Sequence, residues 1–145
     1  MRRAAAPDME MQDVKYWMFA AGIGAVAMAG SAIAASPKGN PAKGQQVFAR
    51  CAACHKVGPN AARSIGPALN GVVGRAAGSD AGFRYSPAMK ASGIKWDEAN
   101  LDSFLQGPAK KVPGTKMIFA GMTAAQDRAD VVAYLKQYDA NGGKK

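Results

Sequence analysis

The chain's two cysteines and its single histidine stand together in one pentapeptide, Cys51-Ala52-Ala53-Cys54-His55. A tetrahedral zinc site built from cysteine and histidine needs four ligands, and no second cysteine pair or further histidine completes one. A structural disulfide between the two thiols would close so short a loop that it would stabilise the fold little. A redox-active disulfide of the thioredoxin kind would need a βαβ setting, which the sequence does not offer.

The spacing C-x-x-C-H is typical of covalent haem attachment. Two thiols at this spacing, late on a helix, can each add to one vinyl group of a haem, and the adjacent histidine can reach the iron from the same side. We therefore predict one covalently attached haem c, held by Cys51 and Cys54, with His55 as an iron ligand. A chance occurrence of the motif is the remaining alternative.

Glycine and proline dominate the segment that follows the motif. Residues 58–84 contain no long periodic run and are predicted to form loops. Helices are predicted over 41–51, from the Ser86-Pro87 cap to about residue 92, and over 97–106, where Gly107-Pro108 ends the helix. We predict an all-α domain of about four to five helices. Loops as long as these in a small domain indicate that they wrap something, and a haem would supply the missing core.

The clearest helix pattern lies near the C-terminus. Thr123 followed by Gln126 matches a capping box, which predicts the start of the helix. Apolar and aromatic residues then recur at three- and four-residue spacing: Val131, Tyr134, Leu135 and Tyr138. Gly142-Gly143 is expected to end the helix, and Lys144-Lys145 is expected to be a frayed tail.

The first 35 residues differ in character from the rest. Residues 16–35 carry no charge and end in the small-residue run Ala32-Ile33-Ala34-Ala35, and basic residues precede them. This order is typical of a secretory signal peptide, while the length also suits an uncleaved membrane anchor. We predict a signal peptide or N-terminal membrane anchor over 1–35, a linker over 36–41 and the haem-binding domain over 42–145.

The formal net charge of +9 belongs to the part behind this leader, because the leader contributes three positive and three negative charges. A surface this basic favours acidic partner proteins. Nucleic acid is not expected as a partner, since the domain is exported and has no basic helix interleaved with aromatic residues. The domain is expected to be a monomer, and residues 16–35 could provide a membrane contact.

An iron that only exchanges electrons needs a second axial ligand, and methionine is the natural donor once the single histidine is used. Met89, Met117 and Met122 follow the motif, although a buried methionine is more often simple packing. Met117 stands apart because it lies in a loop far along the chain from His55, which can fold back over the other face of the haem.

The stretch from 42 to 138 resembles class I cytochromes c, especially the mitochondrial and cytochrome c2 branch. The resemblance rests on several separate motifs: Lys43-Gly44 with Phe48, Gly66-Pro67 with Asn70-Gly71, Gly74-Arg75, the run Val-Pro-Gly-Thr-Lys-Met-Ile-Phe-Ala-Gly over 112–121, and Arg128-Ala129-Asp130 with Tyr134-Leu135. It implies the cytochrome c fold and makes 42–145 a cytochrome c domain.

The resemblance also implies roles for single residues. The carbonyl of Pro67 would accept the second ring N–H of His55. Met117 would be the second axial ligand, so that His55 and Met117 are the metal ligands. Arg75, Tyr85 and Trp96 would contact the haem propionates.

Two positions depart from the family pattern. Met89 stands where the family usually has asparagine, and Phe104 stands where it usually has tyrosine. Both changes remove polar groups expected near the haem. A less polar pocket disfavours the ferric charge, which points to a raised potential.

These features predict a monohaem electron carrier rather than an enzyme, because two axial ligands leave no open iron position. A haem peroxidase or ligand sensor, and a dedicated subunit of a larger complex, are the alternatives. The resemblance implies a bc1-type complex and a terminal oxidase or photosynthetic reaction centre as partners. Lysines near the haem edge are expected to bind acidic surfaces of these partners. The expected location is the periplasm, or the periplasmic face of the cytoplasmic membrane if the leader is retained.

Overall fold

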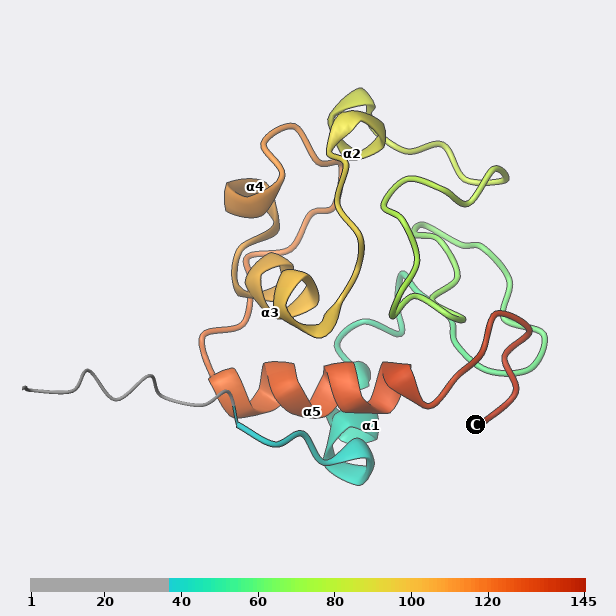
Figure 1. The fold of residues 1–145 in the computed structure, drawn as a ribbon, viewed down its shortest axis with the longest axis vertical. Helices are drawn as coiled ribbons and strands as arrows, with labels where there is room; N and C mark the ends of the chain where they lie inside the picture. The colour runs from blue at the N-terminus through green and yellow to red at the C-terminus, as the bar shows by residue number, and fades with distance from the viewer. Residues whose placement is uncertain (1–36) are drawn as a thin grey trace, which may run out of the picture. The chain divides into compact units, whose positions relative to one another are not determined.

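The computed structural model describes residues 37–145, and the predicted leader over 1–35 lies outside them. Within the described part the regular elements are α-helices, with two isolated β-bridges, Ala76–Lys95 and Tyr138–Lys144, and no strand. The all-α prediction is therefore confirmed. Figure 1 shows the helices in chain order: α1 Pro41–Phe48, α2 Pro87–Ala91, α3 Glu98–Gln106, α4 Pro108–Lys111 and α5 Ala125–Lys136.

α1 begins at Pro41 because the side chain of Asn40 caps it. The Asn40 amide oxygen accepts the N–H groups of Ala42 and Lys43 at 2.9 and 3.2 Å, and a proline suits the first helical position because its missing N–H would be unpaired there. Pro41, the last residue of the expected linker, is thus already helical. The helix ends at Phe48, three residues before the predicted end at 51.

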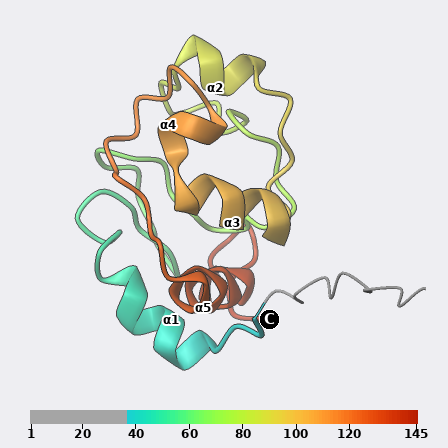
Figure 2. The same ribbon diagram turned by 90° about the vertical axis from the view of Figure 1, so that its left-hand side faces the viewer.

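α1 crosses α5 closely, as the two views in Figures 1 and 2 agree. A Cβ atom at Gly44 would collide with the carbonyl oxygen of Asp130, so only glycine allows the two backbones to approach this far. Phe48 and Tyr134 pack across the crossing with their ring centroids 5.4 Å apart. The Asp130 carboxylate also accepts the Asn40 N–H at 2.7 Å, which ties the start of α1 to α5.

The predicted cap of the last helix is wrong. α5 begins after Ala124, which provides no side-chain cap, and the Thr123 carbonyl instead accepts Arg128 Nη1 at 2.9 Å. Gln126 does not close a capping box either. Its side chain donates to the carbonyl of Lys38 at 3.0 Å and to Asp130 Oδ1 at 2.7 Å, so it fastens the N-terminal segment.

The C-terminal tail is held rather than frayed. α5 ends at Lys136, and the chain turns back so that Lys145 N–H donates to the Gln137 carbonyl at 2.8 Å. The Asp139 carboxylate organises this turn by accepting the N–H groups of Asn141 and Gly143 at 2.8 and 2.9 Å. The expected helix end at Gly142-Gly143 is therefore replaced by a short return.

Local caps set the other helices. Ser86 Oγ accepts the Met89 N–H at 3.1 Å at the start of α2, and Asp97 Oδ1 accepts the Asn100 N–H at 2.7 Å at the start of α3. Both starts were predicted. The single turn α4, which begins at Pro108 directly after the predicted stop, was not.

The core joins residues from α1, α2, α3, α5 and the loops between them. The largest fully buried side chains are those of Val131 and Pro108. In Figure 2 α5 is seen end-on, with α3 above it and α2 and α4 beyond. None of the helices over 37–145 has both the length and the apolar character to cross a bilayer.

Candidate cofactor site

A cavity of about 360 Å³ opens among α2, α3, α5 and the loops that join them to the rest of the chain. Its walls are mainly apolar side chains. Two thiols, an imidazole and two thioethers also face it. The lining includes the cysteines and histidine of the motif, Ile65, Gly66, Pro67, Leu69, Val72, Arg75, Phe83, Tyr85, Met89, Trp96, Leu101, Phe104, Leu105, Met117, Ile118, Phe119, Val131 and Leu135.

The motif follows α1 as a series of tight turns. The Cys51 N–H donates to the Phe48 carbonyl at 2.8 Å, and the His55 N–H donates to the Cys51 carbonyl at 2.8 Å. This winding brings Cys51, Cys54 and His55 to the same cavity wall. Both cysteines are half-buried, and no disulfide joins them. Burial raises the pKa of the Cys51 thiol, and the nearby Arg50 partly offsets that rise.

The imidazole of His55 is held in one tautomer. Its Nδ1 lies 2.8 Å from the carbonyl oxygen of Pro67. Because a carbonyl can only accept, Nδ1 carries the proton and donates, which leaves the Nε2 lone pair free to bind a metal. Burial lowers the pKa of His55, and the bond to Pro67 opposes that shift. Both the neutral state and the tautomer therefore suit a metal ligand.

The three methionines that follow the motif differ in their position relative to the cavity. Met117 and Met89 both line the cavity, whereas Met122 is buried in the core and is not part of the lining. Met117 is half-buried in the loop after α4, where its N–H donates to Thr115 Oγ1 at 3.3 Å. A thioether and an imidazole thus line one apolar cavity.

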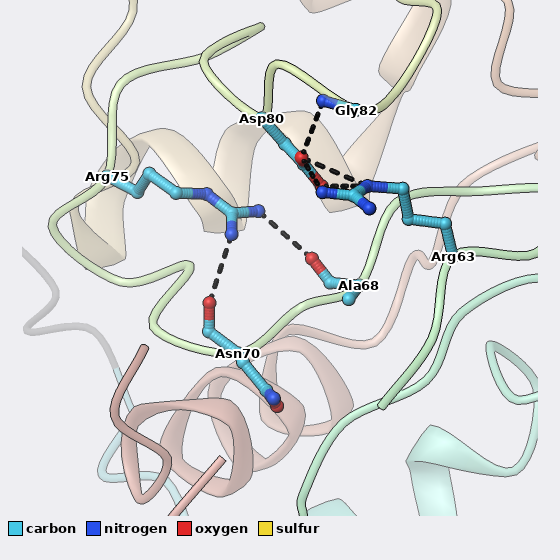
Figure 3. A network of polar contacts seen from close by, with 6 residues as sticks. All are labelled: Arg63, Ala68, Asn70, Arg75, Asp80 and Gly82. Atoms are coloured by element: carbon cyan, nitrogen blue, oxygen red, sulfur yellow. Dashed lines mark hydrogen bonds and ion pairs between the residues drawn. The ribbon is translucent and has the colours of Figure 1, made fainter. Parts of the chain in front are cut away.

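Arg75 lies at the cavity wall, and its guanidinium is committed to the backbone. It donates to the carbonyls of Asn70 and Ala68 at 3.0 and 3.1 Å, as Figure 3 shows. Tyr85 and Trp96 line the same cavity. Tyr85 is half-buried, and this burial is the main reason why its pKa is raised. The structure therefore brings together around one cavity the eight residues that the sequence and the family resemblance assign to the cofactor site, while the further candidate Met122 lies outside it.

An ion pair that the sequence did not reveal braces the loops beside Arg75. Arg63 Nη2 and Asp80 Oδ1 lie 2.7 Å apart, and the Asp80 carboxylate also accepts the Gly82 N–H at 3.1 Å (Figure 3). The Arg63 side chain is the main cause of the lowered pKa of Asp80. No periodicity signals such a pair, because both partners lie in irregular loops. The pattern also gave no sign that Ile65 and Ile118, 77% and 102% exposed, line the cavity.

The two departures from the family pattern both face the cavity. Met89 and Phe104 are buried, and the Phe104 ring packs against Trp96 with the centroids 4.9 Å apart. Among the described residues, no three His, Cys, Asp or Glu side chains gather into a metal-binding cluster. An apolar cavity with an accessible imidazole nitrogen, a thioether and two thiols fits a covalently bound haem, and the arrangement is typical of a c-type haem protein.

Comparison with known proteins agrees with this geometry. The family model described as Cytochrome c matches residues 41–139. The chain is 54% identical over 114 residues to cytochrome c2 of Rhodomicrobium vannielii, covering 76% of this chain and 91% of that protein. It is 46% identical over 135 residues to cytochrome c-554 of Methylosinus trichosporium, covering 93% of this chain and all of that protein. The solved structure of cytochrome cH from Methylobacterium extorquens superposes with a TM-score of 0.64 at 45% identity, covering 68% of this chain and 98% of that one.

The chain belongs to the cytochrome c family and is a class I c-type cytochrome of the cytochrome c2 kind. Its cofactor is haem c, bound covalently through the C-x-x-C-H motif. It is a monohaem electron carrier that works with redox partners.

Proposed function

We propose that His55 and Met117 are the two axial ligands of the haem iron, and that the protein exchanges single electrons without opening either position. The observation that carries this proposal is the bond from His55 Nδ1 to the Pro67 carbonyl, which frees Nε2 within a cavity that Met117 also lines. When bound, the haem supplies the one-electron redox chemistry. The chain itself supplies ligation, burial and an apolar environment.

The remaining site residues follow from the same proposal. Cys51 and Cys54 form the thioether links, and Pro67 orients His55 through its carbonyl. Arg75, Tyr85 and Trp96 would hold the haem propionates, whose negative charge their N–H and O–H groups would stabilise. Arg75 suits this role because two backbone carbonyls already hold its guanidinium in place, so little conformational entropy is lost when it meets an anion.

If His55 and Met117 both hold the iron, no position would be left for a substrate, and the protein would act as a carrier rather than as an enzyme. A peroxidase or a gas sensor would need an open position. The described chain offers no histidine besides His55 that could serve as a distal acid–base group.

The partners we propose are acidic docking surfaces on a bc1-type complex and on a terminal oxidase or reaction centre. Acidic residues are absent from 81–96 and from 103–126, the two segments that contain α2, α4 and the Met117 loop. Basic residues are present in both: Arg84, Lys90, Lys95, Lys110, Lys111 and Lys116. In the rest of the described chain lie all its acidic side chains, four of which are paired with basic ones, among them Asp102 with Arg128 and Asp127 with Arg50. This uneven charge favours approach by the α2 and α4 side.

We further propose that the carrier works in the periplasm, with residues 1–35 as a cleaved signal peptide, 36–41 as the linker and 42–145 as the cytochrome c domain. Retention of residues 16–35 as an anchor would instead hold the same domain at the membrane. Intact mass of the native protein from soluble and membrane fractions separates the two. A soluble haem-bearing species lacking about 35 residues supports cleavage, and a membrane-bound species with the whole leader overturns it.

Carbon monoxide binding tests the ligation. We expect the ferrous protein to bind carbon monoxide slowly and weakly at neutral pH, because Met117 must first leave. Met117→Ala should bind it rapidly, while Met122→Leu, a change at a buried methionine outside the cavity, should behave like the wild type. Rapid binding by the wild type would exclude Met117 as a ligand.

A further inference from the structure

The segment that carries Met117 is fastened at its two ends and has little support between them. Upstream, the Thr115 N–H donates to the Val112 carbonyl at 3.0 Å. Downstream, the Met122 N–H donates to the Leu105 carbonyl at 2.8 Å. Within the described chain, the one hydrogen bond made by residues 116–121 runs from the Met117 N–H to Thr115 Oγ1. The position of Met117 therefore depends on the two fastenings.

The downstream fastening is built around Arg128 on α5. Its Nη1 donates to the carbonyls of Met122 and Thr123 at 2.8 and 2.9 Å. Its Nε and Nη2 donate to the two carboxylate oxygens of Asp102 on α3, at 2.8 and 3.4 Å. The loop that carries Met117, called the methionine loop below, is thus joined at its end to α3 and α5 by one guanidinium.

Burial makes this contact more than a surface ion pair. The Arg128 side chain is 7% exposed, against 42% for Asp102. A buried charged donor is costly to leave unpaired, so the loop carbonyls are held strongly in place. Lysine could not reproduce the contact, because its single ammonium lacks the planar fork that reaches a carboxylate and two carbonyls together.

The methionine loop also packs tightly against α3 at Gly121, just before the residues that Arg128 contacts. Gly121 adopts a φ of +102°, and a Cβ atom there would collide with the Gln106 carbonyl oxygen at the end of α3. The backbone that follows Met117 is therefore pressed onto α3 and held there by Arg128. Release of that clamp is the simplest way for the loop to move away from the cavity.

We propose that Arg128 is a positioning residue for the axial methionine: by clamping the carbonyls of Met122 and Thr123, it keeps Met117 in the cofactor cavity. The role rests on the proposed ligation by Met117. Arg128 does not itself line the cavity, so it acts through the four residues, 118–121, that separate Met117 from Met122. Weakening the clamp raises the fraction of time in which the iron is open to a competing ligand.

Imidazole binding to the ferric holoprotein tests this role, because imidazole competes with the thioether for the iron. The variants are Arg128→Met, Arg128→Lys and Asp102→Ala. Asp130→Asn is the matched control, since it weakens the fastening of α1 to α5 and leaves the methionine loop untouched. Affinity is measured by absorbance well below the unfolding temperature of every variant.

We expect Arg128→Met to bind imidazole at least about tenfold more tightly than the wild type, which corresponds to about 1.4 kcal/mol. Arg128→Lys and Asp102→Ala should show smaller increases of a few fold, because each keeps part of the clamp. Asp130→Asn should bind imidazole as the wild type does, even though it unfolds more readily.

Wild-type imidazole affinity in Arg128→Met, together with a lowered unfolding midpoint, would show that Arg128 is structural only. If Arg128→Met yields no holoprotein, Arg128→Lys and Asp102→Ala decide by the same criterion. Met117→Ala separates this proposal from the one beneath it. If Met117→Ala gains no affinity for imidazole, the proposal that Met117 is an iron ligand is wrong. If Met117→Ala gains affinity and the Arg128 and Asp102 variants do not, only the proposed role of Arg128 is wrong.

Discussion

Gly66 lies directly against the imidazole of His55, so closely that a Cβ atom on Gly66 would collide with Cε1 of the ring and lie 2.7 Å from Nδ1. The glycine precedes Pro67, whose carbonyl accepts the Nδ1 proton. The same short turn therefore supplies both the acceptor that orients the His55 imidazole and the space in which the ring lies.

Substitution of Gly66 by alanine should displace the His55 ring and lengthen its bond to the Pro67 carbonyl. We expect a loss of stability of about 1 to 3 kcal/mol, as for other overpacked sites, together with weaker ligation by His55. Denaturant unfolding and the resonances of the ligand imidazole measure the two effects. Gly107→Ala is the control, because a Cβ atom there meets only Lys110 Cβ at an ordinary 3.4 Å. Equal behaviour of the two variants would contradict the steric argument.

Asp130 should make the stability depend on acid pH. The Asn40 N–H and then the Gln126 amide hold the pKa of its carboxyl below the ordinary value. A carboxyl with a depressed folded pKa contributes stability above its unfolded pKa of about 3.9, and this stability is lost as the pH falls through the folded value. Asp130→Asn should therefore unfold more readily than the wild type at neutral pH, and the difference should shrink as the pH falls below about 4. Thermal unfolding midpoints across this range measure it, and a constant difference would refute the assignment.

Polar atoms restored to the cavity should lower the reduction potential. Met89 and Phe104 both face the cavity with apolar side chains, and added polar groups stabilise the ferric charge. We expect Met89→Asn and Phe104→Tyr each to lower the potential by about 20 to 60 mV, the equivalent of roughly one buried hydrogen bond. Potentiometric titration measures the shift. Met122→Leu should leave the potential unchanged, and a rise in either polar variant would reverse the interpretation.

Charge reversal near the Met117 loop should slow electron transfer to an acidic partner. Lys116 lies beside Met117 in a segment without acidic residues, whereas Lys38 lines a different depression, which Glu98 and Lys136 also line. We expect Lys116→Glu to reduce the second-order rate several-fold at low salt, with the difference from the wild type vanishing near 1 M salt. Lys38→Glu should change the rate little. Stopped-flow kinetics with a purified acceptor measures both, and equal slowing would place the docking surface elsewhere.

Sequence and structure agreed best where the determining contact is local. The starts of α2 and α3 were predictable because Ser86 and Asp97 cap N–H groups three residues away. The start of α5 was not, since the Thr123 carbonyl is bound by Arg128, and Gln126 bonds the carbonyl of Lys38, 88 residues away. The held C-terminal return likewise depends on a bridge between Tyr138 and Lys144 that no helical period reveals.

In the cofactor site, too, local features could be predicted from the sequence and distant contacts could not be predicted from the residue pattern alone. The C-x-x-C-H spacing predicted the cofactor by itself, because three reactive side chains within five residues leave few other uses. The bond between His55 and Pro67, and the inclusion of Met117 in one cavity with them, were expected through family resemblance, since contacts this distant in sequence are set by the whole fold. Nothing in the pattern signalled the Arg63–Asp80 pair or the double contact of Arg128 with the methionine loop, because each depends on irregular loop geometry.

The chain enters the described domain at Pro37, beside α5 and the start of α1, in a depression that shares no lining residue with the cofactor cavity. A peptide joined ahead of Pro37 would therefore hold the protein by that corner. Immobilised through such a peptide on an electrode, the protein would keep the residues around the cavity chemically unmodified, and its current would report on the native cofactor environment.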